Sequence, residues 1–144
     1  MLVKQVSIFV ENKEGKIADV LNILAKENIN ISALSLADTT NFGILRLIVD
    51  DPKKAKNILQ MEDMIVKINE ILAVGINDEP GGLAKVLDIL AKANVQIEYM
   101  YAFTGHNKEY ATVVFKTNDI EKAYDCLKIK DIPLISAEEI KQIW

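Results

Sequence analysis

The fold is decided by a stretch that the chain carries twice: residues 15–31 read GKIADVLNILAKENINI, and residues 81–97 read GGLAKVLDILAKANVQI. Ten of the 17 aligned positions are identical. Farther along, residues 51–55 align with residues 119–123 at an offset that is two residues larger. The extra residues fall in a predicted hairpin turn, where an insertion is tolerated. The chain is therefore a tandem duplication, the feature to establish before any other.

Both copies predict the same order of elements. An alternation of period two at residues 6–10, repeated at 72–76, indicates a strand with one buried face. In the quoted stretches, apolar residues then recur at i, i+3, i+4, i+7 and i+8, which indicates one buried stripe on a helix. Two further strands, a second helix and a short fourth strand complete each copy. The second helices begin at Asp51, which Pro52 follows, and at Asn118 or Asp119, and a capping box predicts a final short helix after Ser136.

The order βαββαβ is the ferredoxin-like plan, with an antiparallel four-stranded sheet and both helices on one face. We therefore predict an α+β protein made of two such modules, residues 1–69 and 70–144, the second ending in the short helix. A module of this size has a thin core, and its second strand is an exposed edge. We expect the two modules to lie side by side through their second strands and to form one eight-stranded sheet with the helices on one face.

Composition and charge argue against several classes of protein. A net charge of −4 and a sequence pI near 5.1 give no basic surface for nucleic acid or an anionic membrane. The apolar runs are too short to cross a bilayer, and the first five residues lack the basic start of a secretory signal, so we expect a cytoplasmic protein. His106, the one histidine, falls in a predicted turn, and Cys126, the one cysteine, on a predicted helix. We expect no catalytic residues, no metal and no cofactor, and hence no enzyme.

The informative loop precedes the first helix of the second copy, at residues 77–83. Gly81 and Gly82 leave backbone N–H groups at the helix start open to a carboxylate, and Asp78 could accept from an α-ammonium group. The two ends of an amino acid are thereby complemented. The alternative is a purely structural turn in which Asp78 caps the helix. The first copy has Asn12 in place of Asp78 and Glu14 in place of proline.

This loop, its helix and the duplication together resemble the ACT family, small ferredoxin-like regulatory modules of amino-acid metabolism. The matching segments are Asp78–Ala84 followed by Asn94–Ile97, and, apart from the missing proline, Asn12–Ala18 followed by Asn28–Ile31. The resemblance covers essentially the whole chain and is strongest to tandem ACT proteins that stand alone.

The resemblance implies that an amino acid binds where two modules meet, between the glycine loop of one module and the second strand of its neighbour. By position it nominates, in the loops, Asn12, Gly15, Lys16, Ile17, Asp78, Pro80, Gly81, Gly82 and Leu83, and, on the second strands, Leu34, Ser35, Leu36, Tyr99, Met100 and Tyr101. It also implies a regulatory or sensor protein whose output passes to a separate metabolic enzyme.

Other functions remain as alternatives. The same fold could serve a ligand-free interaction protein that dimerises and docks on a metabolic enzyme. An RNA-binding module shares the βαββαβ order but needs a basic surface with exposed aromatic residues. On the helix-free face of the sheet, Phe9, Ile44, Ile48 and Val114 are apolar, so we expect a homodimer formed by sheet stacking.

Overall fold

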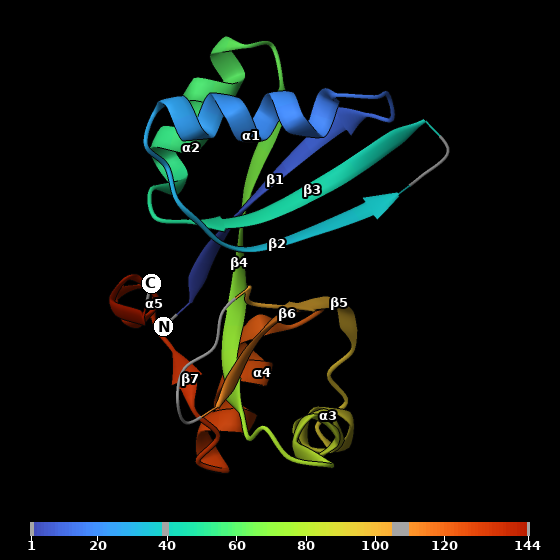
Figure 1. Ribbon diagram of the computed structural model, residues 1–144. Helices are drawn as coiled ribbons and strands as arrows, with labels where there is room; N and C mark the ends of the chain where they lie inside the picture. The colour runs from blue at the N-terminus through green and yellow to red at the C-terminus, as the bar shows by residue number, and fades with distance from the viewer. Residues whose placement is uncertain (1, 39–40, 105–109, 144) are drawn as a thin grey trace. The chain divides into compact units, whose positions relative to one another are not determined.

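The computed structural model describes residues 2–38, 41–104 and 110–143, and this part of the chain falls into two compact units (Figure 1). We call the unit Lys4–Asn69 module 1, and the unit from Glu70 onward, with Leu2 and Val3, module 2. The elements of module 1 are β1 (Val3–Glu11), α1 (Lys16–Lys26), β2 (Ile31–Asp38), β3 (Phe42–Val49), α2 (Pro52–Met61) and the first part of β4 (Ile65–Ile76). Those of module 2 are the rest of β4, α3 (Gly82–Lys92), β5 (Ile97–Ala102), β6 (Ala111–Thr117), α4 (Ile120–Ile129), β7 (Leu134–Ile135) and α5 (Ala137–Ile143).

The sheets have the predicted antiparallel order. In module 1 the strands run β2-β3-β1 with β4 beside β1, and in module 2 they run β7-β4-β6-β5. The α+β class and the tandem ferredoxin-like pattern are thus confirmed. The described residues form seven strands rather than the predicted eight, because β4 is continuous through the junction of the modules. Residues 69–71, Asn-Glu-Ile, contain neither Gly nor Pro, so nothing in them interrupts an extended backbone.

The edge strands keep one partner each. Strand β2 pairs with β3, and β5 pairs with β6. Among the described residues, neither edge strand pairs with a second strand. The side-by-side arrangement through the second strands stays a prediction.

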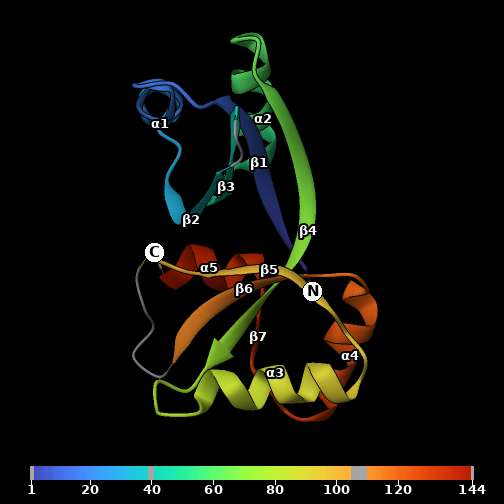
Figure 2. The same cartoon turned by 90° about the vertical axis from the view of Figure 1, so that its right-hand side faces the viewer.

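Each module has its own core on the helix side of its sheet (Figure 2). In module 1, Val20 and Leu24 of α1 are fully buried against β1 and β3, and in module 2 Val86 and Leu90 occupy the equivalent positions of α3. These residues belong to the repeated apolar stripe, so the positions that repeat in the sequence are the positions buried in each core.

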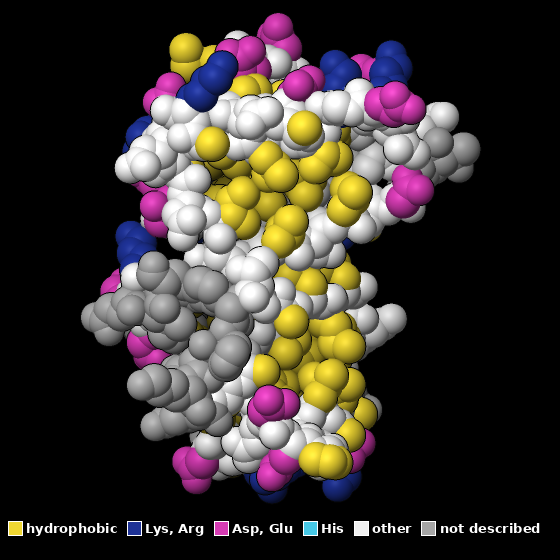
Figure 3. Space-filling model, in the orientation of Figure 1, with side chains coloured by type: hydrophobic (Ala, Val, Ile, Leu, Met, Phe, Trp, Pro, Cys, Tyr) yellow, Lys and Arg dark blue, Asp and Glu magenta, His cyan; other side chains and the backbone are white. Residues whose placement is uncertain are grey.

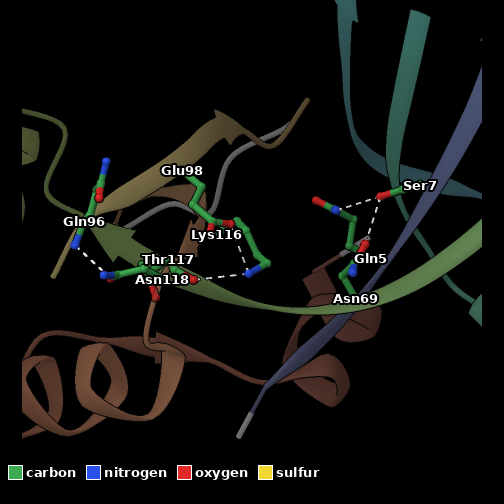
Figure 4. A network of polar contacts seen from close by, with 8 residues as sticks. All are labelled: Gln5, Ser7, Asn69, Gln96, Glu98, Lys116, Thr117 and Asn118. Atoms are coloured by element: carbon green, nitrogen blue, oxygen red, sulfur yellow. Dashed lines mark hydrogen bonds and ion pairs between the residues drawn. The ribbon is translucent and has the colours of Figure 1, made fainter.

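The helix-free faces differ from the expectation. Ile48 and Val114 are only 1% and 0% exposed, so the prediction of an open apolar face is wrong at these positions. In module 1, this side also carries a chain of polar side chains, shown in Figure 4: Gln5 Nε2 donates to Ser7 Oγ at 3.0 Å, and Ser7 Oγ donates to Asn69 Oδ1 at 3.2 Å. In module 2, Lys116 forms an ion pair with Glu98 at 3.2 Å. The homodimer formed by sheet stacking stays a prediction.

The ends of the helices follow the predicted local rules. Asp51 Oδ1 accepts from the amide of Lys54 at 3.0 Å, with Pro52 in the first helical turn, and Asp119 Oδ1 accepts from the amide of Lys122 at 3.1 Å. Asn28 and Asn94 take left-handed backbone geometry, with φ of 57° and 58°, just after α1 and α3.

Removing one of these caps tests the stability of module 2. Asp119→Ala is expected to lower the free energy of unfolding by about 1 kcal/mol, because an amide of α4 loses its acceptor. Urea unfolding followed by circular dichroism measures the change. Asp125→Ala, an exposed position on the same helix, is the control and should change stability by less than about 0.5 kcal/mol. Equal losses in the two variants would contradict the role of the cap.

Candidate functional site

The two glycine loops share one backbone geometry. Gly15 and Gly81 precede α1 and α3 with φ of 82° and 83°, in the left-handed region that glycine adopts without strain. In module 2, the amide of Glu79 donates to the carbonyl of Asn77 at 2.9 Å, and the amide of Gly82 donates to that of Glu79 at 3.0 Å. A Cβ on Gly81 would meet nothing within 4 Å. The turn therefore leaves its outer side open to a ligand.

Neither glycine-loop helix has a side-chain cap, in contrast to α2 and α4. The amides of Leu83 and Ala84 in α3 have no acceptor in the described part of the chain, and the same holds for Ile17 and Ala18 in α1. The alternative reading, in which Asp78 caps its helix, is thus wrong. Free first-turn amides at the positive end of the helix dipole are suited to bind a carboxylate.

The two loops differ in the residue that precedes the glycine turn, which is Asn12 in module 1 and Asp78 in module 2. In module 1, Asn12 Nδ2 donates to Asp38 Oδ1 at 3.1 Å, and the Asn12 amide donates to the Asn41 carbonyl at 3.1 Å. In module 2, Asp78 is exposed, and its carboxylate has no hydrogen bond or ion pair among the described residues. The carboxylate of Asp78 is therefore available to a ligand, whereas the amide of Asn12 is already engaged.

The charges near the loops also differ. In module 1, Lys13 Nζ lies 3.0 Å from Glu11 Oε2, and this hydrogen-bonded pair holds the pKa of Glu11 below its usual range. Lys16 occupies the first position of α1. Module 2 has Gly82 at that position and the acidic pair Asp78 and Glu79 before it. The second loop thus combines free amides with negative side chains, and a zwitterion needs both.

Packing is tighter at the second loop. A Cβ on Gly82 would collide with the carbonyl oxygen of Asn77. A hollow of about 110 Å³ adjoins this turn, and its lining includes Lys85 of α3 and Pro133, which precedes β7. Neither residue is among those nominated from the sequence. Lys85 faces the loop from one turn farther along the repeated helix, which helical periodicity could have indicated, but the position of Pro133 depends on strand pairing far along the chain.

The strand register sorts the nominated second-strand residues into two groups. Leu34 and Leu36 pair with Leu47 and Leu45, whose side chains are in the core, so they lie on the helix side of the sheet. By the same argument Met100, which pairs with Phe115, lies on the helix side of module 2. These three side chains are 42%, 54% and 43% exposed.

The other nominated strand residues face the opposite way. Ser35 pairs with Arg46, and Tyr99 and Tyr101 pair with Lys116 and Val114 on the helix-free side. The two tyrosine rings stack on each other, with centroids 6.5 Å apart. Since the glycine loops lead into helices, only the helix-side group shares a face with them. Figure 3 shows hydrophobic side chains gathered between α1 and β2 in module 1 and between β5 and α3 in module 2.

The described residues lack the features typical of metal sites, membrane-spanning helices or reactive cysteines. No group of three His, Cys, Asp or Glu side chains there could hold a metal ion, and no helix found there could cross a membrane. Burial raises the pKa of the Cys126 thiol, which also donates to the carbonyl of Ala123 at 3.3 Å. His106 lies outside the described residues.

Comparison with known proteins points to one family. The family described as "ACT domain pair" matches residues 1–144. Protein BT0572 from Bacteroides thetaiotaomicron, of solved structure, is 44% identical with a TM-score of 0.91, over 97% of this chain and 96% of that one. The ligand-free regulatory subunit of aspartate kinase from Thermus thermophilus shares the fold at 16% identity and a TM-score of 0.63, over 89% and 93% of the two chains.

A third structure is that of aspartokinase III from E. coli in complex with lysine and aspartate. It is 16% identical with a TM-score of 0.52, and the match covers 90% of this chain but only 30% of the enzyme. No match was found among curated proteins.

Proposed function

The chain belongs to the family of ACT domain pairs, and from this membership we propose that it is a regulatory protein that binds a free amino acid, not an enzyme. The observation that carries the proposal is the start of α3, where two free backbone amides lie close in sequence to the unpaired carboxylate of Asp78. Of the two aspartate-kinase structures named above, which share the fold, one is a regulatory subunit and the other holds lysine and aspartate.

The chemistry of binding follows from the two ends of the ligand. The amides of Leu83 and Ala84 donate to the ligand carboxylate, and the helix dipole favours its charge. Asp78 accepts from the ligand ammonium group, which selects amino acids over simple carboxylic acids. Gly81 and Gly82 leave the backbone bare, so the ligand reaches the amides without meeting a side chain.

The side chain of the ligand needs a further wall. We propose that the edge strand of a neighbouring module supplies it, through the exposed helix-side residues Leu34 and Leu36 or Met100. Such a wall favours an apolar or long side chain. The first loop, with Asn12 engaged by Asp38, is proposed to bind more weakly or not at all.

A thermal-shift screen of the twenty amino acids tests the proposal. Ligand at about 100 times its dissociation constant adds about 2.7 kcal/mol to the free energy of unfolding, which for a chain of this size raises Tm by roughly 5–10 °C. The matching acid without the amino group is the control and should give a smaller shift. A screen in which all twenty compounds leave Tm unchanged would contradict amino-acid binding.

That negative result would favour the second candidate function, an interaction protein without a ligand. The observation in its favour is the exposure of Leu34, Leu36 and Met100 along two edge strands. Unpaired strand edges with apolar side chains are suited to pair with another protein. A homodimer, or a complex with a metabolic enzyme, would then be the functional state.

A further inference from the structure

A groove runs between α3 and α4 on the outer side of module 2. Its volume is about 790 Å³, and it lies over the helices rather than at the sheet edge. Its lining residues are Gly81, Ala84, Lys85, Asp88, Ile89, Lys92, Ala93, Cys126, Ile129 and Lys130. The floor is apolar, and Ile129 is 78% exposed, which marks a surface that gains from being covered.

The rim of the groove is basic in an acidic protein. Lys85, Lys92 and Lys130 line it against a single acidic residue, Asp88, although the whole chain has a net charge of −4. An apolar floor with a basic rim is complementary to an apolar surface that carries acidic residues.

The duplication supplies such a surface on the same chain. The repeat offsets place, at the equivalent positions of α1 and α2, Gly15, Ala18, Asp19, Asn22, Ile23, Lys26, Glu27, Ile58, Met61 and Glu62. The apolar positions remain apolar, except that Ala93 is replaced by Glu27, and Met61, the counterpart of Ile129, is 83% exposed. The charges are reversed, because Asp19, Glu27 and Glu62 now stand against one lysine, Lys26.

One further cation lies at the end of this surface. Lys54 Nζ of α2 donates to the carbonyl of Glu27 at 2.9 Å, across the helix pair. Its counterpart in module 2 is Lys122, also a lysine, so this position does not distinguish the two surfaces. The opposite sign of the two helix faces therefore holds whether or not these lysines are counted.

From this internal complementarity we propose that the α3/α4 groove of one copy receives the α1/α2 face of a second copy of the chain. Exposed Ile129 and Met61 cover each other's apolar surroundings, and the lysine rim meets the acidic rim. The contact joins two different faces, so it is heterologous. Each copy can use its α3/α4 groove in one contact and its α1/α2 face in another. It does not use the strand edges, and it adjoins the glycine loop of module 2, because Gly81 and Lys85 line both the groove and the hollow beside that loop.

Charge-reversal variants test the proposal on the full chain by sedimentation velocity. The wild type is expected to self-associate, and raising NaCl from about 0.05 M to about 0.5 M should weaken association about tenfold through screening. The triple variant Lys85→Glu, Lys92→Glu, Lys130→Glu should lose association, and so should Asp19→Lys, Glu27→Lys, Glu62→Lys. The variant with all six changes has an acidic groove and a basic α1/α2 face at the wild-type net charge. The two faces again have opposite signs, so association should return.

The control is a triple variant with the same change of net charge away from both faces, Lys53→Glu, Lys128→Glu, Lys141→Glu. It should associate at least a few fold more tightly than the groove triple. Circular dichroism confirms that each variant is folded. A wild type that stays monomeric up to hundreds of micromolar, a control that loses association equally, or a folded six-fold variant that stays monomeric would each overturn the proposal.

Cys126 provides a second readout inside the groove. It is the only cysteine of the chain, and it is partly exposed. Its reaction with a maleimide should slow several fold as the wild-type concentration rises through the range of association. The groove triple variant should show no such slowing. Equal labelling rates at all concentrations of an associating wild type would place the interface elsewhere.

Discussion

Asp78→Asn is expected to weaken amino-acid binding by about 10–100-fold. The substitution keeps the size of the side chain but removes the negative charge that accepts from the ligand ammonium group, and a hydrogen bond between charged groups contributes about 1.5–3 kcal/mol. Calorimetric titration with the amino acid found in the thermal screen measures the change. The fold should be unaffected, because Asp78 is exposed and has no hydrogen bond or ion pair to another described residue.

The repeat provides the matched control. Asn12→Ala changes the equivalent position of module 1, where the side chain is held by Asp38. If the loop of module 2 is the binding site, Asn12→Ala leaves the dissociation constant unchanged within about twofold. A larger effect from Asn12→Ala than from Asp78→Asn would move the site to the first loop.

Gly82→Ala is expected to destabilise module 2 by about 1–3 kcal/mol, the usual cost of forcing extra volume into a packed site. At an ordinary helical position this substitution stabilises, because alanine has the higher helix propensity. Here the added Cβ collides with the carbonyl oxygen of Asn77, and a backbone atom cannot turn aside as a flexible side chain can. A loss of stability, measured by urea unfolding, would therefore show that the loop leaves no room for a Cβ at position 82.

Lys16→Ala is the control for this prediction, since Lys16 is the residue of module 1 at the same position. Its backbone already carries a Cβ, so shortening the exposed side chain should change stability by no more than about 0.5 kcal/mol. If Gly82→Ala stabilised the protein, the collision would be relieved by a small shift of the turn. The binding loop would then be more adaptable than its geometry indicates.

The features predicted correctly from the sequence are those decided by neighbouring residues. The apolar stripe of each first helix gave the buried residues, such as Leu24 and Leu90, because helical periodicity alone fixes which side faces the core. The cap at Asp51 was predicted for the same reason, since an acceptor and its amide lie three residues apart, and of the two candidates Asn118 and Asp119 the structure shows Asp119 as the cap.

What the sequence analysis missed depends on residues far apart in the chain. The hydrogen bond from Asn12 to Asp38 spans 26 positions, and only the paired strands bring these groups together. That Tyr99 and Tyr101 lie on one face of their strand and Met100 on the other could have been predicted from the sequence, because alternate residues of a strand face opposite ways. Which of the two faces carries the helices was then decided by the register with β6.

The continuity of β4 constrains how the gene can change length. Inserting or deleting one codon early in this strand would reverse the facing of every later residue of the strand, so Leu72 and Val74 would exchange places with their outward neighbours. Only changes in pairs preserve the alternation. Between β2 and β3, or β5 and β6, no such parity rule applies, and there the two halves of the duplication have drifted apart in length.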